Sequence, residues 1–252
     1  MKTALITGAS SGFGKAIATA FARKGYRLII TGRRNEKLEA LKPKLMDLGA
    51  KDVLLLSFDI QDKEAVNNAV DSLSGEWKNI DILINNAGLA VGKSTIENGE
   101  IDDWERMINT NVKGLLYMTR ALIATLKNSD GPHIVNIGSI AGTEVYPGGN
   151  VYCASKHAVN ALSKAMRIEL LPYAIRVSQI RPGLAETEFS VVRYKGDETK
   201  AADVYKGYEP LLAEDVARAV EFVVDQPKHV CINDLEITPT AQANAYLIEK
   251  NG

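Results

Sequence analysis

The sequence predicts an α/β protein in which helices cover both faces of a doubly wound parallel sheet of about seven strands. Short β-branched or leucine-rich runs alternate along the chain with longer stretches of helical periodicity, which is typical of βαβ units. Gly25, Gly49 and Gly75 stand where successive helices are expected to end, because glycine adopts the left-handed conformation of a helix C-terminus without steric strain. Neither an internal repeat nor a linker interrupts the pattern, so residues 1–252 are predicted to form a single domain.

The elements follow in order along the chain. The expected strands lie near 2–7, 27–31, 53–57, 80–84, 133–138, 174–180 and 234–237. The expected helices lie near 13–24, 36–48, 62–74, 101–127, 150–171 and 213–225. The late stretch of about 184–212 is irregular and rich in charge and tyrosine, and a long insertion of this kind predicts a lid over a functional site.

Charge and composition exclude several classes of protein. The 30 Lys and Arg residues against 31 Asp and Glu give a formal net charge of -1, so we expect no bulk attraction to nucleic acid or to an anionic membrane. The apolar run 3–7 is too short for a signal peptide, and no segment reaches the roughly 18 apolar residues of a membrane span. Cys153 and Cys231 are expected to be free thiols in a reducing compartment, so we expect a cytoplasmic protein.

A glycine-rich turn follows the first expected strand. Gly8, Gly12 and Gly14 let the chain turn sharply and bring a diphosphate close to the amides of a helix N-terminus, as in Rossmann-type folds. The alternative is a tight strand-to-helix turn with no ligand. The residues predicted to bind a dinucleotide here are Gly8, Ser10, Ser11, Gly12, Phe13 and Gly14.

The end of the second strand indicates which dinucleotide is bound. An acidic residue at this place would bind the ribose hydroxyls of NAD, whereas arginine accommodates the 2′-phosphate of NADP. The chain offers Arg33 and Arg34 and has no acid between Arg27 and Asn35, so NADP is the predicted cofactor. The alternative is a pair of solvated arginines at the start of a helix.

A tyrosine and a lysine share one face of the helix expected at 150–171. Tyr152 and Lys156 are four residues apart, and a neighbouring cation favours the phenolate and moves the tyrosine pKa toward neutrality. Ser139 follows the strand 133–138, where parallel sheets bind ligands, and is placed to present a hydroxyl to the same substrate oxygen. Alone, the Tyr-x-x-x-Lys pattern often marks only a helix face.

In combination these marks resemble the short-chain dehydrogenase/reductase family. They follow the family's order along the chain, and they are Thr7-Gly8 to Gly14, Asp59, Asn85-Asn86-Ala87-Gly88, Asn111-Val112-Lys113-Gly114, Ser139, Tyr152 with Lys156, and Pro182-Gly183 with Thr187. The resemblance implies that Tyr152 is the general acid and base and that Ser139 binds the reacting oxygen. Lys156 would lower the tyrosine pKa and hold the nicotinamide ribose, and Asn111 would support a proton relay to Lys156.

The resemblance also implies further cofactor contacts and an assembly. Asp59 would face the adenine, and the nicotinamide end would be bound by the stretch 180–187, with Pro182, Gly183 and Thr187. Asn86, Ala87 and Gly88 would line the cofactor, although this motif is equally well explained as a stabiliser of the sheet. Members of the family commonly form tetramers through the helices that carry Asn111 and Tyr152, so a homotetramer is expected.

The segment after Pro182-Gly183 narrows the substrate. Its sequence, with Arg193, resembles the branch of the family that oxidises 3-hydroxy acids, and a similar segment occurs in sulfoacetaldehyde reductases. Arg193 on a closing lid is suited to bind a small anion, with Lys195 assisting as a point charge. Alternatively, Arg193 pairs with Glu188 or Asp197 and orders the lid. Tyr146 either shapes the pocket or packs a loop.

The predicted function is therefore transfer of a hydride between NADP and a short 3-hydroxy acid or its semialdehyde or keto form. The alternatives are a sulfoacetaldehyde or broad aldehyde and ketone reductase, and a protein that binds NADPH as a sensor without chemistry. No metal is expected, because His133, His157 and His229 lack ligand spacing, and His157 is interpreted as a bystander.

Overall fold

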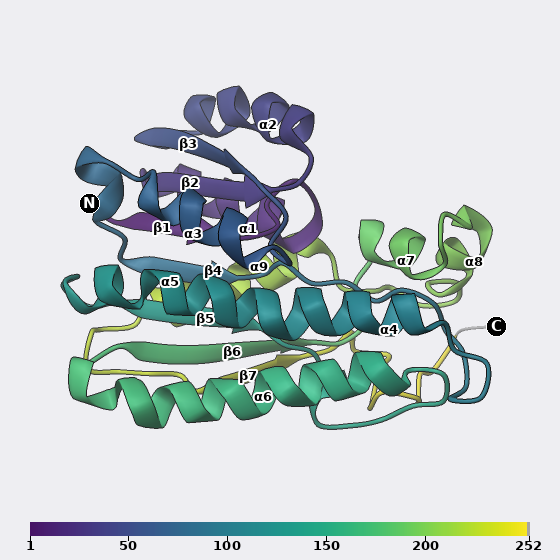
Figure 1. Cartoon of the computed structure of the whole chain (residues 1–252). Helices are drawn as coiled ribbons and strands as arrows, with labels where there is room; N and C mark the ends of the chain where they lie inside the picture. The colour runs from purple at the N-terminus through teal and green to yellow at the C-terminus, as the bar shows by residue number, and fades with distance from the viewer. Residues whose placement is uncertain (251–252) are drawn as a thin grey trace.

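The computed structural model describes residues 1–250 and builds one parallel sheet with the order β3-β2-β1-β4-β5-β6-β7 (Figure 1). Each predicted strand is confirmed, with ends that differ by two residues at most. The strands are β1 (Thr3–Ile6), β2 (Arg27–Gly32), β3 (Asp52–Ser57), β4 (Ile82–Asn85), β5 (His133–Ile137), β6 (Arg176–Pro182) and β7 (Asp234–Ile237). Their interior residues are mostly buried because helices cover both faces.

The helices divide between the two faces, as a doubly wound sheet requires. One apolar core lies beneath α1 (Gly12–Arg23), α2 (Asn35–Asp47) and α9 (Ala213–Val224). The other lies beneath α3 (Lys63–Asp71), α5 (Leu115–Lys127) and α6 (Asn150–Leu170). The chain passes from β3 at one edge back to β4 beside β1, so the C-terminal ends of β1 and β4 form the switch point where such sheets bind ligands.

Two of the three predicted helix stops are confirmed. Gly25 and Gly49 follow α1 and α2 with φ of 71° and 107°, values that favour glycine. Gly75 also has a positive φ, but α3 already ends at Asp71, and Gly75 opens a short 3-10 turn (Gly75–Lys78). The prediction that Gly75 ends a helix is therefore wrong.

The helix expected at 101–127 is interrupted. It consists of α4 (Ile101–Ile108), a π-helical segment (Asn109–Gly114) and α5. A π segment inserts a wider turn into an α-helix, and such segments are frequent at functional sites. Here the wide turn carries Asn111, whose amide contacts the loop after β4, and Gly114, where a Cβ would lie 3.2 Å from the carbonyl oxygen of Ile60.

The late stretch expected to be irregular contains two short helices. They are α7 (Glu188–Arg193), capped by the hydroxyl of Thr187, and α8 (Glu198–Asp203), capped by the carboxylate of Asp197. Figure 1 shows both standing beyond the C-terminal ends of the strands, apart from the helices that cover the sheet. The insertion therefore lies at the edge of the sheet where a ligand is expected.

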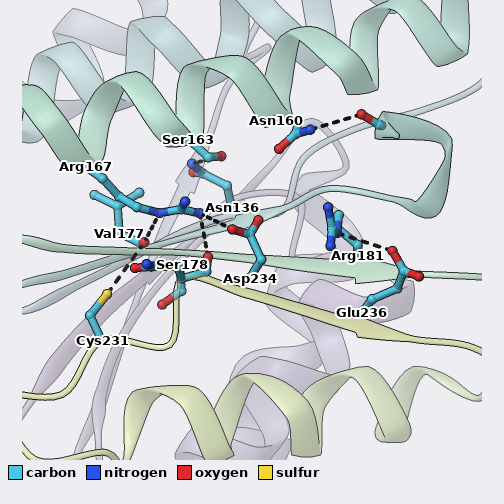
Figure 2. Close-up of polar contacts among 12 residues, drawn as sticks. Asn136, Asn160, Ser163, Arg167, Val177, Ser178, Arg181, Cys231, Asp234 and Glu236 are labelled. Carbon is cyan, nitrogen blue, oxygen red and sulfur yellow. Dashed lines mark hydrogen bonds and ion pairs between the residues drawn. The ribbon is translucent and has the colours of Figure 1, made fainter. Parts of the chain in front are cut away.

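Polar contacts fix α6 against the last strands (Figure 2). The guanidinium of Arg167 donates to the carbonyl of Val177 on β6 at 2.9 Å and pairs with Asp234 on β7 at 2.9 Å. The amide of Asn136 on β5 donates to the Ser163 hydroxyl at 2.9 Å. These contacts hold the helix that carries the Tyr-x-x-x-Lys pair in a fixed position on the sheet.

None of the helices within residues 1–250 has both the length and the hydropathy that a membrane span requires.

Candidate active site

A cleft of about 300 Å³ opens at the switch point, and most of the predicted cofactor residues line it. Those that do are Gly8, Ser10, Ser11, Gly12, Phe13, Arg33, Arg34, Asp59, Asn86, Ala87, Gly88, Tyr152, Lys156 and Thr187. Three predicted residues are elsewhere. Gly14 packs behind the turn, whereas Pro182 and Gly183 line a second cavity next to the cleft.

The glycine-rich turn fits an anionic diphosphate. Ser11 precedes α1 without capping it through its side chain, and the first turn of α1 has no acidic residue, so the helix N-terminus remains electropositive. Gly12 has a φ of 52°, and a Cβ on Gly14 would lie 2.5 Å from the carbonyl oxygen of Gly8. The turn and the helix therefore come together only because these positions lack side chains, and Gly12 and Phe13 at the start of α1 line the cleft.

The two arginines at the end of β2 have different surroundings. The side chain of Arg33 is half exposed, and its one ion pair within the described chain is a loose contact of 3.5 Å with Asp59. The guanidinium of Arg34 donates to the hydroxyls of Ser10 and Ser11 at 3.0 and 2.7 Å and pairs with Glu188 at 2.8 Å. Arg33 is thus the freer of the two, while Arg34 joins the turn to the lid.

The Asn85-Asn86 pair is engaged by the protein itself. The amide of Asn85 donates to Thr119 and Asn136 at 2.9 Å inside the sheet. The amide of Asn86 donates to the carbonyl oxygens of Thr7 and Gly8, at 2.8 and 3.2 Å. The alternative that this motif stabilises the sheet therefore describes both side chains, although Asn86 also borders the cleft.

A second cavity of about 570 Å³ adjoins the cleft and shares Phe13, Thr187 and Tyr152 with it. The predicted substrate residues Ser139, Tyr146, Tyr152 and Arg193 all line this cavity. The structure therefore brings together four side chains from the loop after β5, from α6 and from the lid. The shared wall places the phenol of Tyr152 between the cofactor cleft and the substrate cavity.

The pKa of Tyr152 shifts in the direction opposite to the one expected. Burial disfavours the phenolate and raises the pKa of Tyr152, while a hydrogen bond with Ser139 and the charge of Arg193 act against the shift. Lys156 does not offset this burial, because its ammonium lies 6.0 Å from the centre of the tyrosine ring and donates to the carbonyl of Ile137 at 2.9 Å. In the protein alone, the neighbouring ammonium therefore does not bring the phenol pKa toward neutrality.

Lys156 and Asn111 lie behind the tyrosine. Lys156 is buried, and the desolvation lowers its pKa to about 8. Asn111 is buried as well, and its amide contacts both backbone groups of Leu89 at 2.8 Å and the Ser155 hydroxyl at 2.9 Å. Gly88 packs close to both side chains, since a Cβ there would lie 3.3 Å from the Asn111 side-chain oxygen and 3.6 Å from the Lys156 ammonium.

Arg193 lies at the end of α7, over the aromatic rings of the cavity. Its guanidinium carbon is 5.2 Å from the centre of the Tyr146 ring and 5.7 Å from that of Tyr152. Its Nε is buried and has no hydrogen-bond partner in the described chain. Arg193 lines the cavity, and a half-buried cation in a cavity wall is suited to bind an anion there.

The alternative partners of Arg193 are engaged elsewhere. Glu188 pairs with Arg34 and Lys37, and Asp197 pairs with Lys200. The alternative that these acids order the lid by pairing with Arg193 is therefore wrong. The suggestion that Lys195 assists at the site is also wrong, because its ammonium pairs with Asp103 of α4 at 2.7 Å.

Some wall residues were not predicted from the sequence. The segment after β7 covers the substrate cavity with Gln242, Ala245 and Ile248. Gln242 is buried and accepts a hydrogen bond from the backbone amide of Leu184 at 2.8 Å. No motif marks this segment. Its one local signal is Gly183, which leaves room for the Gln242 amide, since a Cβ there would lie 2.2 Å from the Gln242 oxygen.

A Rossmann-type sheet with a glycine-rich turn at its switch point and a buried Tyr-x-x-x-Lys helix face defines a dinucleotide-dependent oxidoreductase. The chain belongs to the short-chain dehydrogenase family, whose model matches residues 2–197. This confirms the resemblance drawn from the motifs.

Named relatives cover almost the whole chain. It is 46% identical over 244 residues to the NADP-dependent 3-hydroxy acid dehydrogenase of Escherichia coli K12, covering 96% of this chain and 97% of the relative. It is 44% identical to the sulfoacetaldehyde reductase of Chromohalobacter salexigens, covering 97% of this chain and 96% of the relative. The solved closed form of serine dehydrogenase with NADP+ superposes with a TM-score of 0.92 at 44% identity, over 99% of this chain and 100% of that one.

Proposed function

We propose that the protein is an NADP-dependent oxidoreductase that transfers a hydride between nicotinamide and a short 3-hydroxy acid or its semialdehyde or keto form. Membership of the short-chain dehydrogenase family and the names of relatives similar over the whole chain support this function. One observation carries the choice of substrate: the half-buried guanidinium of Arg193 lines the cavity beside Tyr152. That arrangement suits a short molecule with a carbonyl or hydroxyl at one end and an anion at the other.

Each catalytic residue has a proposed role that its position supports. The cofactor supplies or accepts the hydride when it is bound in the cleft. Tyr152 gives a proton to the carbonyl oxygen during reduction and removes one during oxidation, and its raised pKa keeps it protonated for reduction at neutral pH. Ser139 holds the reacting oxygen, while Lys156 binds the nicotinamide ribose. Asn111 positions the loop after β4 and supports a proton relay to Lys156.

The cofactor end is divided between the turn and the arginines. The backbone amides at the start of α1 suit the diphosphate, and the half-exposed Arg33 suits the 2′-phosphate. Asp59 is proposed to face the adenine, while Ala87 and Gly88 border the cofactor. Pro182, Gly183 and Thr187 are proposed to hold the nicotinamide end, where the cleft and the second cavity meet.

The test of this function is a panel of carbonyl compounds and alcohols assayed with NADPH or NADP+. Malonic semialdehyde, serine, allo-threonine and 3-hydroxybutyrate represent the carboxylates, sulfoacetaldehyde represents the sulfonates, and neutral ketones serve as the third group. We expect turnover of carboxylates. Sulfoacetaldehyde reductase activity is the second candidate, because Arg193 binds either anion and a similar relative has that name. No turnover with any carboxylate would contradict the proposal.

Replacing Arg193 tests the anion site directly. For Arg193→Ala we expect kcat/KM for carboxylate substrates to fall about 100-fold, because a charge-assisted bidentate contact is lost, while neutral ketones lose little. Arg218→Ala, which removes an exposed arginine of α9, is the matched control. Equal losses on charged and neutral substrates would mean that Arg193 orders the lid and does not bind the substrate.

The assembly and the cellular location are proposed as a homotetramer in the cytoplasm. Leu115 and Val159 lie on the helices proposed to pair, but they are buried in the protein's own core and do not support it. Leu116 of α5 and Ile168 of α6 are exposed apolar residues on the helices proposed to pair, and they do support it. Sedimentation equilibrium with the parent protein and with Leu116→Glu measures the assembly.

A further inference from the structure

A carboxylate of the lid lies among the cations at the adenosine end of the cofactor cleft. Glu188, the first residue of α7, pairs with Arg34 at 2.8 Å and with Lys37 at 2.9 Å, and it lines the cleft. These contacts cross more than 150 residues of sequence, from the start of α2 to the lid. Arg34 and Lys37 therefore hold the lid, through Glu188, over the same end of the cleft that Arg33 borders.

We propose that Glu188 modulates cofactor preference: it latches the lid to α2, and its negative charge lowers the preference for NADPH over NADH. The inference rests on the proposed use of NADP by this cleft. It concerns a residue of the lid that belongs neither to the glycine-rich turn nor to the catalytic set.

The contacts of Arg34 explain why one particular nitrogen of its guanidinium pairs with Glu188. Its Nε and Nη2 are bound by the serine hydroxyls of the glycine-rich turn, which leaves Nη1 for Glu188. Since these contacts fix the guanidinium on both sides, it presents a rigid anchor to the lid. Lys37, one turn further along α2, adds the second cation on the other oxygen of the carboxylate.

The charge of Glu188 is present under all ordinary conditions. Hydrogen bonds with Arg34 and Lys37 lower its pKa to about 2 against the opposing effect of burial, so the carboxylate stays ionised even at mildly acidic pH. A 2′-phosphate held by Arg33 would bring further negative charge to the same cations. The phosphate and the carboxylate repel each other, whereas NADH brings no charge to this point and leaves the latch intact.

The short helix α7 connects this latch to the substrate cavity. Glu188 begins the helix and Arg193 ends it, and the carbonyl oxygen of Arg193 accepts a hydrogen bond from the backbone amide of Gly92 at 3.0 Å. The latch therefore holds the first residue of this helix, and the Gly92 amide holds the last residue, which carries the cation over Tyr152. Loosening the latch is expected to loosen the anion site as well.

The experiment compares the parent with Glu188→Gln, a near-isosteric change that removes the charge. The dissociation constants of NADPH and NADH are measured by fluorescence titration, and lid opening is measured as the rate of tryptic cleavage at the exposed Lys195 and Lys200 without cofactor. We expect the ratio of the NADH constant to the NADPH constant to rise about two- to fivefold, the effect of one exposed ion pair, and we expect faster cleavage. Glu186→Gln removes an exposed carboxylate two residues earlier and should change neither value.

Lys37→Gln provides a second variant with a different signature. It breaks the latch but keeps the Glu188 carboxylate, so tryptic cleavage of the lid should also be faster. The ratio of the NADH to the NADPH dissociation constant should fall, because a cation has been lost. An unchanged or lower ratio in Glu188→Gln overturns the specificity role, and unchanged cleavage in both variants overturns the latch. If the parent binds neither dinucleotide, the proposed function and the specificity role fail together, whereas the cleavage rates still decide the latch.

Discussion

Lys156 is a single residue whose proposed function conflicts with the stability of the fold. Its ammonium is buried, which lowers its pKa from the ordinary value of 10.5 to about 8, so keeping it charged in the folded protein is unfavourable at neutral pH. One hydrogen bond, to the carbonyl of Ile137, offsets part of this penalty. A position that accepts such a penalty is typical of a functional site.

Replacing this lysine is therefore expected to stabilise the protein while abolishing turnover. We expect Lys156→Met to raise the free energy of unfolding by about 1 to 3 kcal/mol at pH 7. The Lys156 amine binds its proton more tightly in the unfolded chain than in the folded chain. The gain in the free energy of unfolding is therefore complete below pH 8 and disappears as the pH rises toward 10.5. Urea denaturation at several pH values measures it, with Lys164→Met on the exposed side of α6 as the control. Destabilisation at neutral pH would contradict this account.

At the scale of elements, the contact between the glycine-rich turn and α1 is one of the tight contacts around the cofactor cleft. A Cβ on Gly14 would lie 2.5 Å from both the Gly8 carbonyl oxygen and the Asn86 amide nitrogen, and neither neighbour is free to move. For Gly14→Ala we expect the affinity for NADPH to fall more than about tenfold, since the turn must shift away from the helix N-terminus.

The control for that change is another glycine far from the cleft. A Cβ on Gly75 meets nothing within 4 Å, and its positive φ makes Gly75→Ala modestly destabilising, by about 1 kcal/mol. Fluorescence titration with NADPH should separate the two variants, with Gly75→Ala retaining the parent affinity. If Gly14→Ala also retained it, the turn would not be the diphosphate site.

Elements with a strong local signal could be predicted from the sequence. The alternation of apolar runs and helical stretches gave all seven strands, because buried parallel strands are short and apolar. The π-helical turn at Asn111 could not be predicted, since it depends on contacts of that side chain with Leu89 and Ser155. The helices α7 and α8 were also missed, because six-residue helices give little periodicity.

At the scale of the whole molecule, the site joins segments from almost the full length of the chain. Motifs identified most of the cleft, because each motif residue is tied to a turn or a strand end that the sequence marks. Ion pairs could not be predicted in the same way. Glu188 was weighed as a partner of Arg193, yet the fold brings it to Arg34 and Lys37, and the segment that carries Gln242 closes the cavity without any local mark.

The raised pKa of Tyr152 also depends on the whole fold. The helix face suggested a phenol acidified by Lys156, but the sheet and the lid together bury the ring, and the effect of burial is larger. The raised pKa fits the proposed role of the tyrosine as proton donor for reduction at neutral pH, and under that proposal oxidation should become faster as the pH rises.

The central claim is that Tyr152 transfers the proton in an NADPH-dependent reaction, and the most direct measurement compares Tyr152→Phe with the parent. NADPH oxidation with malonic semialdehyde is followed by absorbance, and NADPH affinity is measured by fluorescence. We predict that kcat falls about 100- to 10,000-fold while the dissociation constant of NADPH changes less than about threefold. Equal turnover by the two proteins, or no turnover by the parent with any compound of the panel, would contradict the account.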